Sequence, residues 1–363
     1  PAGPRARAGI AASTAGLRHD PSGRAGARPD RRALARAGRR RHNRAMRVFH
    51  RAPRLPDAFR GAAVAIGNFD GVHRGHRAVL DAARALVPGA APGVLTFEPH
   101  PREVLQPDRA PARLTPLAAK LRLLREAGAR FVQVLRFDRA LIAMPAEAFV
   151  REVLVERLGA AGVAVGQDFR FGHGRGGDPA LLTRLGPILG FRASVVTPLA
   201  VDGEPCSSTR VRELLGDGHV ALAAALLGRP HAVEGRVVRG DGRGRQIGFP
   251  TANLALRGRR PMLPAAGVYA VTVRPRPGGA VVWPGVANLG HRPTFEGREL
   301  RLEVHLLDRG PDLYGAPLEV GFVERLRGEM RFDGIESLRA QIARDVAQAR
   351  AVHGLDPDPG RVG

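Results

Sequence analysis

The chain has 363 residues, 44% of them hydrophobic, and this length favours two globular domains over one. The single cysteine, Cys206, excludes an intramolecular disulfide and is typical of a reducing compartment such as the cytoplasm, and no apolar run approaches the roughly 20 residues of a membrane span. The net charge of +23 would favour a nucleic-acid partner, but residues 1–45 carry 10 of these charges and Lys120 is the only lysine among 57 basic residues. This arginine bias is typical of a GC-rich coding sequence, so we expect neither a nucleic-acid nor a membrane partner.

Residues 1–45 are rich in Ala, Gly and Arg and have no sustained periodicity, which predicts disorder. A mitochondrial transit peptide would explain the arginines, but its long amphipathic faces are missing. A basic arm that binds nucleic acid is a further alternative. We expect Met46 to be the natural first residue of the protein and residues 1–45 to be an upstream extension.

Strand-like and helix-like runs alternate from residue 62 to about 190. The strand-like runs are 64–66, 94–97, 131–137 and 163–169, and the helix-like runs are 77–87, 116–127, 145–158 and 179–189. Alternation of this kind predicts an α/β domain in which helices cover a parallel sheet. Ligands then bind at the carboxyl ends of the strands.

The loop after the first of these strands, residues 66–76, is rich in glycine and carries His73 and His76. Glycines let the backbone approach an anion, and the helix that follows offers free N–H groups, so the loop predicts a phosphate site. The two imidazoles could stabilise charge that develops on a phosphate. The alternative is a pair of surface histidines on an ordinary turn. The chain has no P-loop motif.

Two later segments carry further candidate ligand groups. Residues 166–178 mix phenylalanines and arginines after a strand, as expected for stacking a planar ring beside a phosphate, although a flexible loop with core phenylalanines would have the same composition. Residues 207–212 combine hydroxyl groups and arginines before a helix. They predict either an ordinary N-cap or a phosphate clamp.

The pattern changes after Arg229-Pro230, the expected domain boundary. Short β runs at 231–239, 267–274, 281–289, 300–307 and 317–324, separated by Gly and Pro, predict a small antiparallel barrel. A single helix is expected at 335–352 and a frayed tail from 353 onward. The expected domains are therefore 46–229 and 230–352.

The densest motif of this second half spans residues 235–253. Its glycines would allow a flap to lie on phosphates, and Thr251 and Asn253 offer oxygen atoms suited to Mg²⁺. A glycine-rich hairpin is the alternative. In the run 300–307, Glu303 faces away from Leu302 and Val304. It is either a solvated strand residue, which spacing alone favours, or a base for an alcohol substrate.

The string GNFDGVHRGH resembles the HxGH signature of the nucleotidylyltransferase superfamily, in the form found in bacterial bifunctional riboflavin kinase/FAD synthetases. GRGRQIGFPTANL, GVANLGHRPTF, EVHLLD and DLYG are similar to the riboflavin kinase module of that family, in the same order. The resemblance covers about residues 46–350. Cys206 replaces a usual apolar residue, and Arg309 stands where an aromatic residue is common.

The resemblance implies an N-terminal Rossmann-like domain that adenylylates FMN to FAD and a C-terminal barrel that phosphorylates riboflavin to FMN, both with ATP and Mg²⁺. It implies that ATP is bound in the adenylyltransferase by Gly67, Phe69, Asp70, His73, His76, Ser208, Thr209 and Arg212. It implies FMN binding by Asp168, Phe169 and Arg170. In the kinase it implies ATP or flavin binding by Gly240, Gly242, Gly244, Arg245, Gly248, Pro250, Thr251 and Asn253. Thr251 and Asn253 would also hold Mg²⁺, and Glu303, His73 and His76 would be the catalytic residues.

Two other functions compete with this interpretation. The first is an adenylyltransferase for a different phosphorylated metabolite, with the β domain as a regulatory module. The second is an arginine-rich nucleic-acid-binding protein that reuses the fold, whose affinity would fall steeply with salt. The sequence leaves the oligomeric state open.

Overall fold

A computed structural model describes residues 46–356 of the chain, apart from 51, 91, 241, 259, 280, 295–296 and 309. The arginine-rich segment 1–45, Arg309 and the end of the tail lie outside these residues. The described residues all belong to one compact unit.

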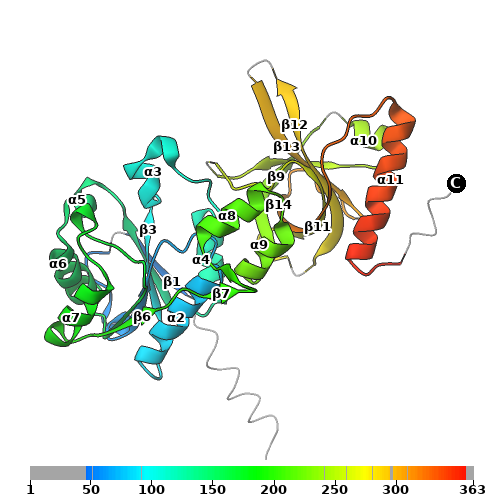
Figure 1. Cartoon of the computed structure of the whole chain (residues 1–363). Helices are drawn as coiled ribbons and strands as arrows, with labels where there is room; N and C mark the ends of the chain where they lie inside the picture. The colour runs from blue at the N-terminus through cyan, green and yellow to red at the C-terminus, as the bar shows by residue number, and fades with distance from the viewer. Residues whose placement is uncertain are drawn as a thin grey trace, which may run out of the picture. The chain divides into compact units, whose positions relative to one another are not determined.

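The first half of the described chain forms a parallel sheet with helices around it (Figure 1). The sheet has six strands in the order β1-β4-β3-β2-β5-β6. Its strands are β1 (Arg47–His50), β2 (Ala63–Ile66), β3 (Gly93–Glu98), β4 (Phe131–Arg136), β5 (Gly162–Gly166) and β6 (Arg192–Val196). Because β2 lies inside the sheet between β3 and β5, the loop that follows β2 opens at the middle of the carboxyl edge. The predicted α/β fold is confirmed.

Helices cover both faces of this sheet because neighbouring strand residues point to opposite sides. On one face, α2 (Arg74–Leu86) and α4 (Leu117–Glu126) pack on Ala65 and Val94. On the other face, η3 (Phe149–Arg157) and α7 (Pro179–Leu189) pack on Ile66 and Leu95. Figure 1 shows α2 and α7 on opposite sides of the strands.

Shorter elements complete this half. They are η1 (Asp57–Phe59), α3 (Pro101–Leu105), η2 (Pro107–Arg109), α5 (Arg139–Ala143), α6 (Ala146–Ala148), η4 (His173–Arg175), the hairpin β7 (Ala200–Val201) and β8 (Glu204–Pro205), α8 (Ser208–Gly216) and α9 (Val220–Leu227).

The second half of the described chain is a closed antiparallel barrel with the order β10-β13-β12-β11-β14-β9. Its strands are β9 (His231–Val238), β10 (Ala252–Leu256), β11 (Gly267–Pro275), β12 (Trp283–Thr294), β13 (Gly297–Leu306) and β14 (Pro317–Arg327), with the short α10 (Arg243–Gln246) between the first two. The predicted barrel is confirmed.

Two helices pack on the outside of the barrel. The terminal helix α11 (Ile335–Val352) lies against β11, β12 and β14 (Figure 1), and Asp345 on it bonds to Arg327 of β14 at 2.8 Å. Helix α9 packs on β9 and β14, so that Leu226 and Leu227 share one apolar core with the barrel residues. No helix in the described ranges is long and apolar enough to cross a membrane.

The structure differs from the sequence-based prediction in three details. Strands β1, β6, β7, β8 and β10 were not predicted, and β10 begins within the motif 235–253, for which the sequence predicts a phosphate flap or, alternatively, a glycine-rich hairpin. Helix α2 begins at Arg74 and not at residue 77, because the His73 side chain caps it. Strand β5 ends at Gly166, so that Asp168 lies in the turn that follows.

Candidate functional site

The backbone of the loop between β2 and α2 has positive φ values at a glycine and also at two residues that rarely adopt them. Gly71 has a φ of 90°, which suits glycine, but Phe69 and Val72 also have positive φ values of 50° and 44°. Strain of this kind costs on the order of 1–3 kcal/mol per residue and is concentrated at functional sites. Gly75 also avoids a tight contact, because a Cβ atom there would lie 3.0 Å from the Cys206 carbonyl oxygen.

The His73 side chain forms the N-cap of α2. Its Nδ1 atom accepts a hydrogen bond from the backbone N–H of His76 at 3.3 Å. In a neutral imidazole the other ring nitrogen then carries the proton, so Nε2–H of His73 is the hydrogen-bond donor. This is the tautomer needed to bind a phosphate oxygen.

The two histidine rings stack with their centroids 3.6 Å apart. Burial lowers the pKa of His73 to about 4, with the charges of Arg229 and Arg212 adding to the effect and that of Asp70 opposing it. Burial and then His73 lower the pKa of His76 well below its ordinary value. Both rings are therefore neutral at pH 7, which removes the repulsion that two imidazolium ions would have at this distance.

Residues 207–212, at the start of α8, contact the same loop through Ser208 and Arg212. The other side chains of this segment do not share those partners. Ser207 is the N-cap, as the simpler interpretation predicted, and the Ser208 hydroxyl donates to the Asp70 carbonyl at 2.8 Å. Arg210 is paired with Glu204. Arg212 bonds to the carboxylate of Asp70, and Thr209 is exposed.

Asp70 itself is a buried residue, with only 1% of its surface exposed. Burial alone would raise the pKa of Asp70, but Arg212 and Arg113, together with the backbone N–H of Thr115, hold this pKa below its usual value. The Asp70 carboxylate is therefore ionised, and its negative charge is balanced by neighbouring arginines of the protein.

Arg229, at the predicted domain boundary, also reaches the loop. Its Nη2 donates to the Gly71 carbonyl at 2.6 Å and its Nη1 to the Val72 carbonyl at 3.4 Å. Cys206 accepts from the Gly75 N–H at 3.2 Å and lies 3.6 Å from His73 Nδ1. Neither residue was predicted at this site, because nothing in the spacing relates it to the histidine motif.

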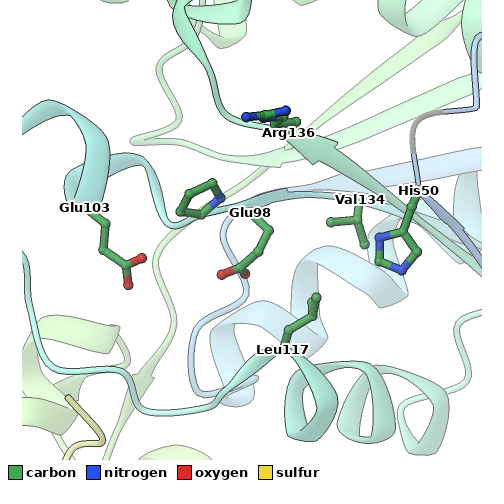
Figure 2. Close-up of a pocket in the computed structure, with 7 residues that line it drawn as sticks. His50, Glu98, Glu103, Leu117, Val134 and Arg136 are labelled. Atoms are coloured by element: carbon green, nitrogen blue, oxygen red, sulfur yellow. The ribbon is translucent and has the colours of Figure 1, made fainter. Parts of the chain in front are cut away.

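A group of charged residues lies beside the loop at the end of β3. Arg113 bonds to Glu98 at 3.0 Å and to Glu103 at 2.9 Å, and Figure 2 shows these two carboxyl groups turned toward one another. Lys120 is fully buried, its Nζ lies 3.8 Å from Glu98, and no described residue accepts a hydrogen bond from that nitrogen. Burial, followed by the charge of Arg113, lowers the pKa of Lys120 to about 8.

These carboxylates border a cavity of about 440 Å³ at the carboxyl ends of β1, β3 and β4. Leu117 and Val134 form its apolar side, and His50 and Arg136 lie at its edges (Figure 2). None of the residues predicted to bind FMN lines this cavity.

The residues predicted to bind FMN follow β5, on the other side of β2. Phe169 stacks with the buried Phe171 at a ring distance of 5.5 Å. Asp168 and Arg170 are exposed, and the Arg170 guanidinium bonds to the Phe169 carbonyl at 2.8 Å. The carboxyl edge of the sheet thus places this group on the β5 side of the histidine loop and the cavity on the β3 side.

The glycine-rich motif of the second half folds around α10 before β10. A Cβ atom on Gly240 would overlap the Asn253 side chain, and one on Gly244 would lie 3.1 Å from the Thr251 hydroxyl. These glycines therefore allow the backbone to approach the two predicted Mg²⁺ ligands closely. Gly242 and Gly248 have φ values of 70° and 88°.

The remaining residues of this motif differ in how far they are described. Pro250 is exposed, and its carbonyl accepts a 2.8 Å hydrogen bond from His305 Nδ1. The side chain of Arg245 lies outside the described residues.

Barrel register brings Asn253 and Glu303 together. Asn253 on β10 lies directly opposite Glu303 on β13, and Glu303 lies opposite Asn288 on β12. Directly opposed residues share a face, so the three side chains form one polar row across three strands. Their neighbours Leu254 and Leu302 are buried in the barrel core, so this row lies on the outer face. Asn288 was not predicted, although it belongs to a motif that had been singled out.

Family models match both halves of the chain. A model described as FAD synthetase matches residues 55–210, and one described as riboflavin kinase matches residues 227–353.

Full-length relatives match across both halves. A bifunctional riboflavin kinase/FMN adenylyltransferase from Escherichia coli K12 is 46% identical over 85% of this chain and 98% of its own length. One from Bacillus subtilis is 34% identical over 79% and 91%. A solved structure from Streptococcus pneumoniae, described as a macrolide-efflux protein, is 29% identical, has a TM-score of 0.74 and covers 84% of this chain and 98% of its own. The chain belongs to the family of bifunctional riboflavin kinases/FMN adenylyltransferases.

Proposed function

We propose that this chain carries out the two reactions named for its relatives: phosphorylation of riboflavin to FMN, and transfer of AMP from ATP to FMN to give FAD and pyrophosphate. The observation that carries the proposal is the assembly of two separate polar sites, one at the β2–α2 loop and one on the barrel face, each on the half of the chain that matches the corresponding family model. We place the boundary between the two modules at Arg229-Pro230.

In the adenylyltransferase, a phosphate oxygen of FMN attacks the α-phosphate of ATP, and pyrophosphate leaves. Nε2–H of His73 would donate to the phosphate on which charge accumulates, and the buried neutral rings favour donation over proton transfer. The positive end of the α2 helix dipole would add to this stabilisation, while the N–H groups of Gly75 and His76 are bonded to Cys206 and His73. Arg212, held by Asp70, would provide the fixed positive charge.

In the kinase, the primary hydroxyl of riboflavin attacks the γ-phosphate of ATP. Glu303 would accept the proton from that hydroxyl, since it is half-buried on the polar row and directly opposite Asn253. Thr251 and Asn253 fit a hard cation because both offer neutral oxygen atoms beside a glycine-rich backbone. Mg²⁺ bound there would neutralise charge on the ATP phosphates.

The test is incubation of the full chain with riboflavin, ATP and Mg²⁺, with FMN and FAD followed by chromatography. Successive appearance of FMN and FAD supports both activities. FAD made from supplied FMN, without any FMN made from riboflavin, would reduce the barrel to a regulatory module. The lone Cys206 is compatible with the cytoplasmic location that we infer for this reaction sequence.

A further inference from the structure

The carboxylate of Asp70 is fully occupied by protein groups. Its Oδ1 accepts from the Thr115 N–H at 2.9 Å and from the Thr115 hydroxyl at 3.1 Å. Its Oδ2 accepts from the Leu114 N–H at 3.2 Å and also from Arg212. A buried carboxylate with this many donors organises its surroundings and has little capacity left for a ligand.

Thr115 uses the same hydroxyl for a second bond. It accepts from the Gly71 N–H at 3.0 Å, and the Thr115 residue is 4% exposed. Gly71 lies in the strained loop, between Phe69 and Val72 with their positive φ values. The hydroxyl thus joins the carboxylate of Asp70 to the backbone that leads into the histidine motif.

The segment that carries Thr115 also holds Arg212. The Arg212 Nε donates to the Ala112 carbonyl at 2.7 Å, its Nη1 donates to the Ser208 carbonyl at 3.1 Å, and its Nη2 bonds to Asp70. These bonds fix the plane of the guanidinium and use one N–H of each nitrogen, which leaves a second N–H on Nη1 and on Nη2 for the phosphate contact proposed above.

On its other side, this segment is attached to residues that precede β11. The N–H of Arg113 donates to the Arg260 carbonyl at 2.9 Å, and the N–H of Met262 donates to the Arg113 carbonyl at 2.8 Å. The segment that carries Thr115 is therefore anchored at Arg113 as well as by its bonds to Asp70 in the histidine loop.

We propose that Thr115 is a positioning residue of the adenylyltransferase. It acts through Asp70 and Gly71, and it keeps Arg212 and the histidine loop in the geometry that the triphosphate of ATP requires. The inference rests on the proposed function of this site and adds a residue that neither the motif nor the spacing contains.

The test compares Thr115→Val with Thr115→Ser in the full chain. Valine keeps the shape but leaves the buried Gly71 N–H without its acceptor, which typically reduces a coupled function by about 10- to 100-fold. We expect that loss in kcat/KM for ATP in FMN adenylylation, whereas serine should stay within about threefold of the parent chain. Riboflavin phosphorylation should stay near the parent value in both variants, and the unpaired N–H should lower the Tm of Thr115→Val by only a few degrees.

A double-mutant cycle separates positioning from a merely structural role. If Thr115 acts through Arg212, adding Thr115→Val to Arg212→Ala should lower adenylylation by much less than it does alone. Thr183→Val is the control for loss of a threonine hydroxyl away from the site, because Thr183 is exposed on α7 and its hydroxyl donates to the Pro179 carbonyl of the same helix at 3.0 Å.

Three results would overturn the inference. They are parent-like adenylylation in Thr115→Val, an equal loss in both activities together with a lowered Tm, and full additivity with Arg212→Ala. A parent chain that makes no FAD from FMN and ATP would instead overturn the proposed function itself.

Discussion

Replacing His73 with Asn should separate the two contributions of this residue to stability. Asparagine is a favoured N-cap residue, so its side-chain oxygen can replace Nδ1 as the acceptor for the His76 N–H. The free energy of unfolding at pH 7 should then stay within about 1 kcal/mol of the parent value. What the variant loses is the titration of a buried imidazole.

The pKa of His73 determines the direction in which pH changes the stability of the parent chain. His73 has a pKa of about 4 in the folded chain against an ordinary 6.5. Between these values the unfolded chain binds a proton that the folded chain does not, so acidification destabilises the folded state. The free energy of unfolding that depends on His73 therefore falls by about 2 kcal/mol between pH 7 and pH 5.

Denaturant unfolding of both proteins at pH 7 and pH 5 provides the measurement. The parent chain should lose about 2 kcal/mol more than His73→Asn over this interval, with similar denaturant slopes. His231, in the barrel, is also buried with a pKa of about 4 and should titrate identically in both proteins, so its contribution cancels in the comparison. Equal pH dependence in the two proteins would mean that His73 titrates normally, and the neutral stacked pair would be wrong.

Three further predictions concern the other groups. Glu303→Gln should lower riboflavin phosphorylation by about 100- to 10,000-fold while FAD formation from supplied FMN persists, and a parent-like kinase rate would return Glu303 to a solvated strand residue. Gly240→Ala should raise the KM of the kinase for Mg²⁺–ATP, because its Cβ would displace Asn253; an unchanged KM would remove that amide from the ATP site. Because Lys120 is the only lysine, NMR of protein labelled at the lysine ε position should show one side-chain resonance that titrates near pH 8, and titration near its ordinary 10.5 would contradict the buried state.

The local sequence predicts structure reliably where the residues that determine it are contiguous in the chain. The strand–loop–helix around His73 and His76 could be predicted because its glycines, apolar strand and amphipathic helix are contiguous. Strand β1 could not, because its four residues lie at the edge of the sheet and are exposed or half-buried without the alternation that marks a strand. Strand β10 begins directly after Pro250 and Thr251, and their turn-forming character concealed it.

The residues that form hydrogen bonds to the histidine loop from distant parts of the chain could not be predicted from the local sequence. Thr115 and Arg229 bond to Gly71 from positions 44 and 158 residues away. No periodicity relates such positions, since their approach depends on how whole elements cross the sheet edge. Lys120 carried one signal that could have been used: a chain that otherwise contains only arginine keeps a lysine at this one buried position.

The proposed kinase site could be predicted from the sequence only in part. Alternation along β13 correctly placed Glu303 on the face opposite Leu302 and Val304, whose side chains are buried. Alternation could not reveal which residue of β10 or β12 stands beside it, because a shift of one residue in strand register exchanges the two faces. The observed register puts Asn253 and Asn288 on either side of Glu303. The carboxylate therefore has an amide neighbour on each adjoining strand, an arrangement that a purely solvated strand residue would not require and that a base aimed at a ribityl hydroxyl would use.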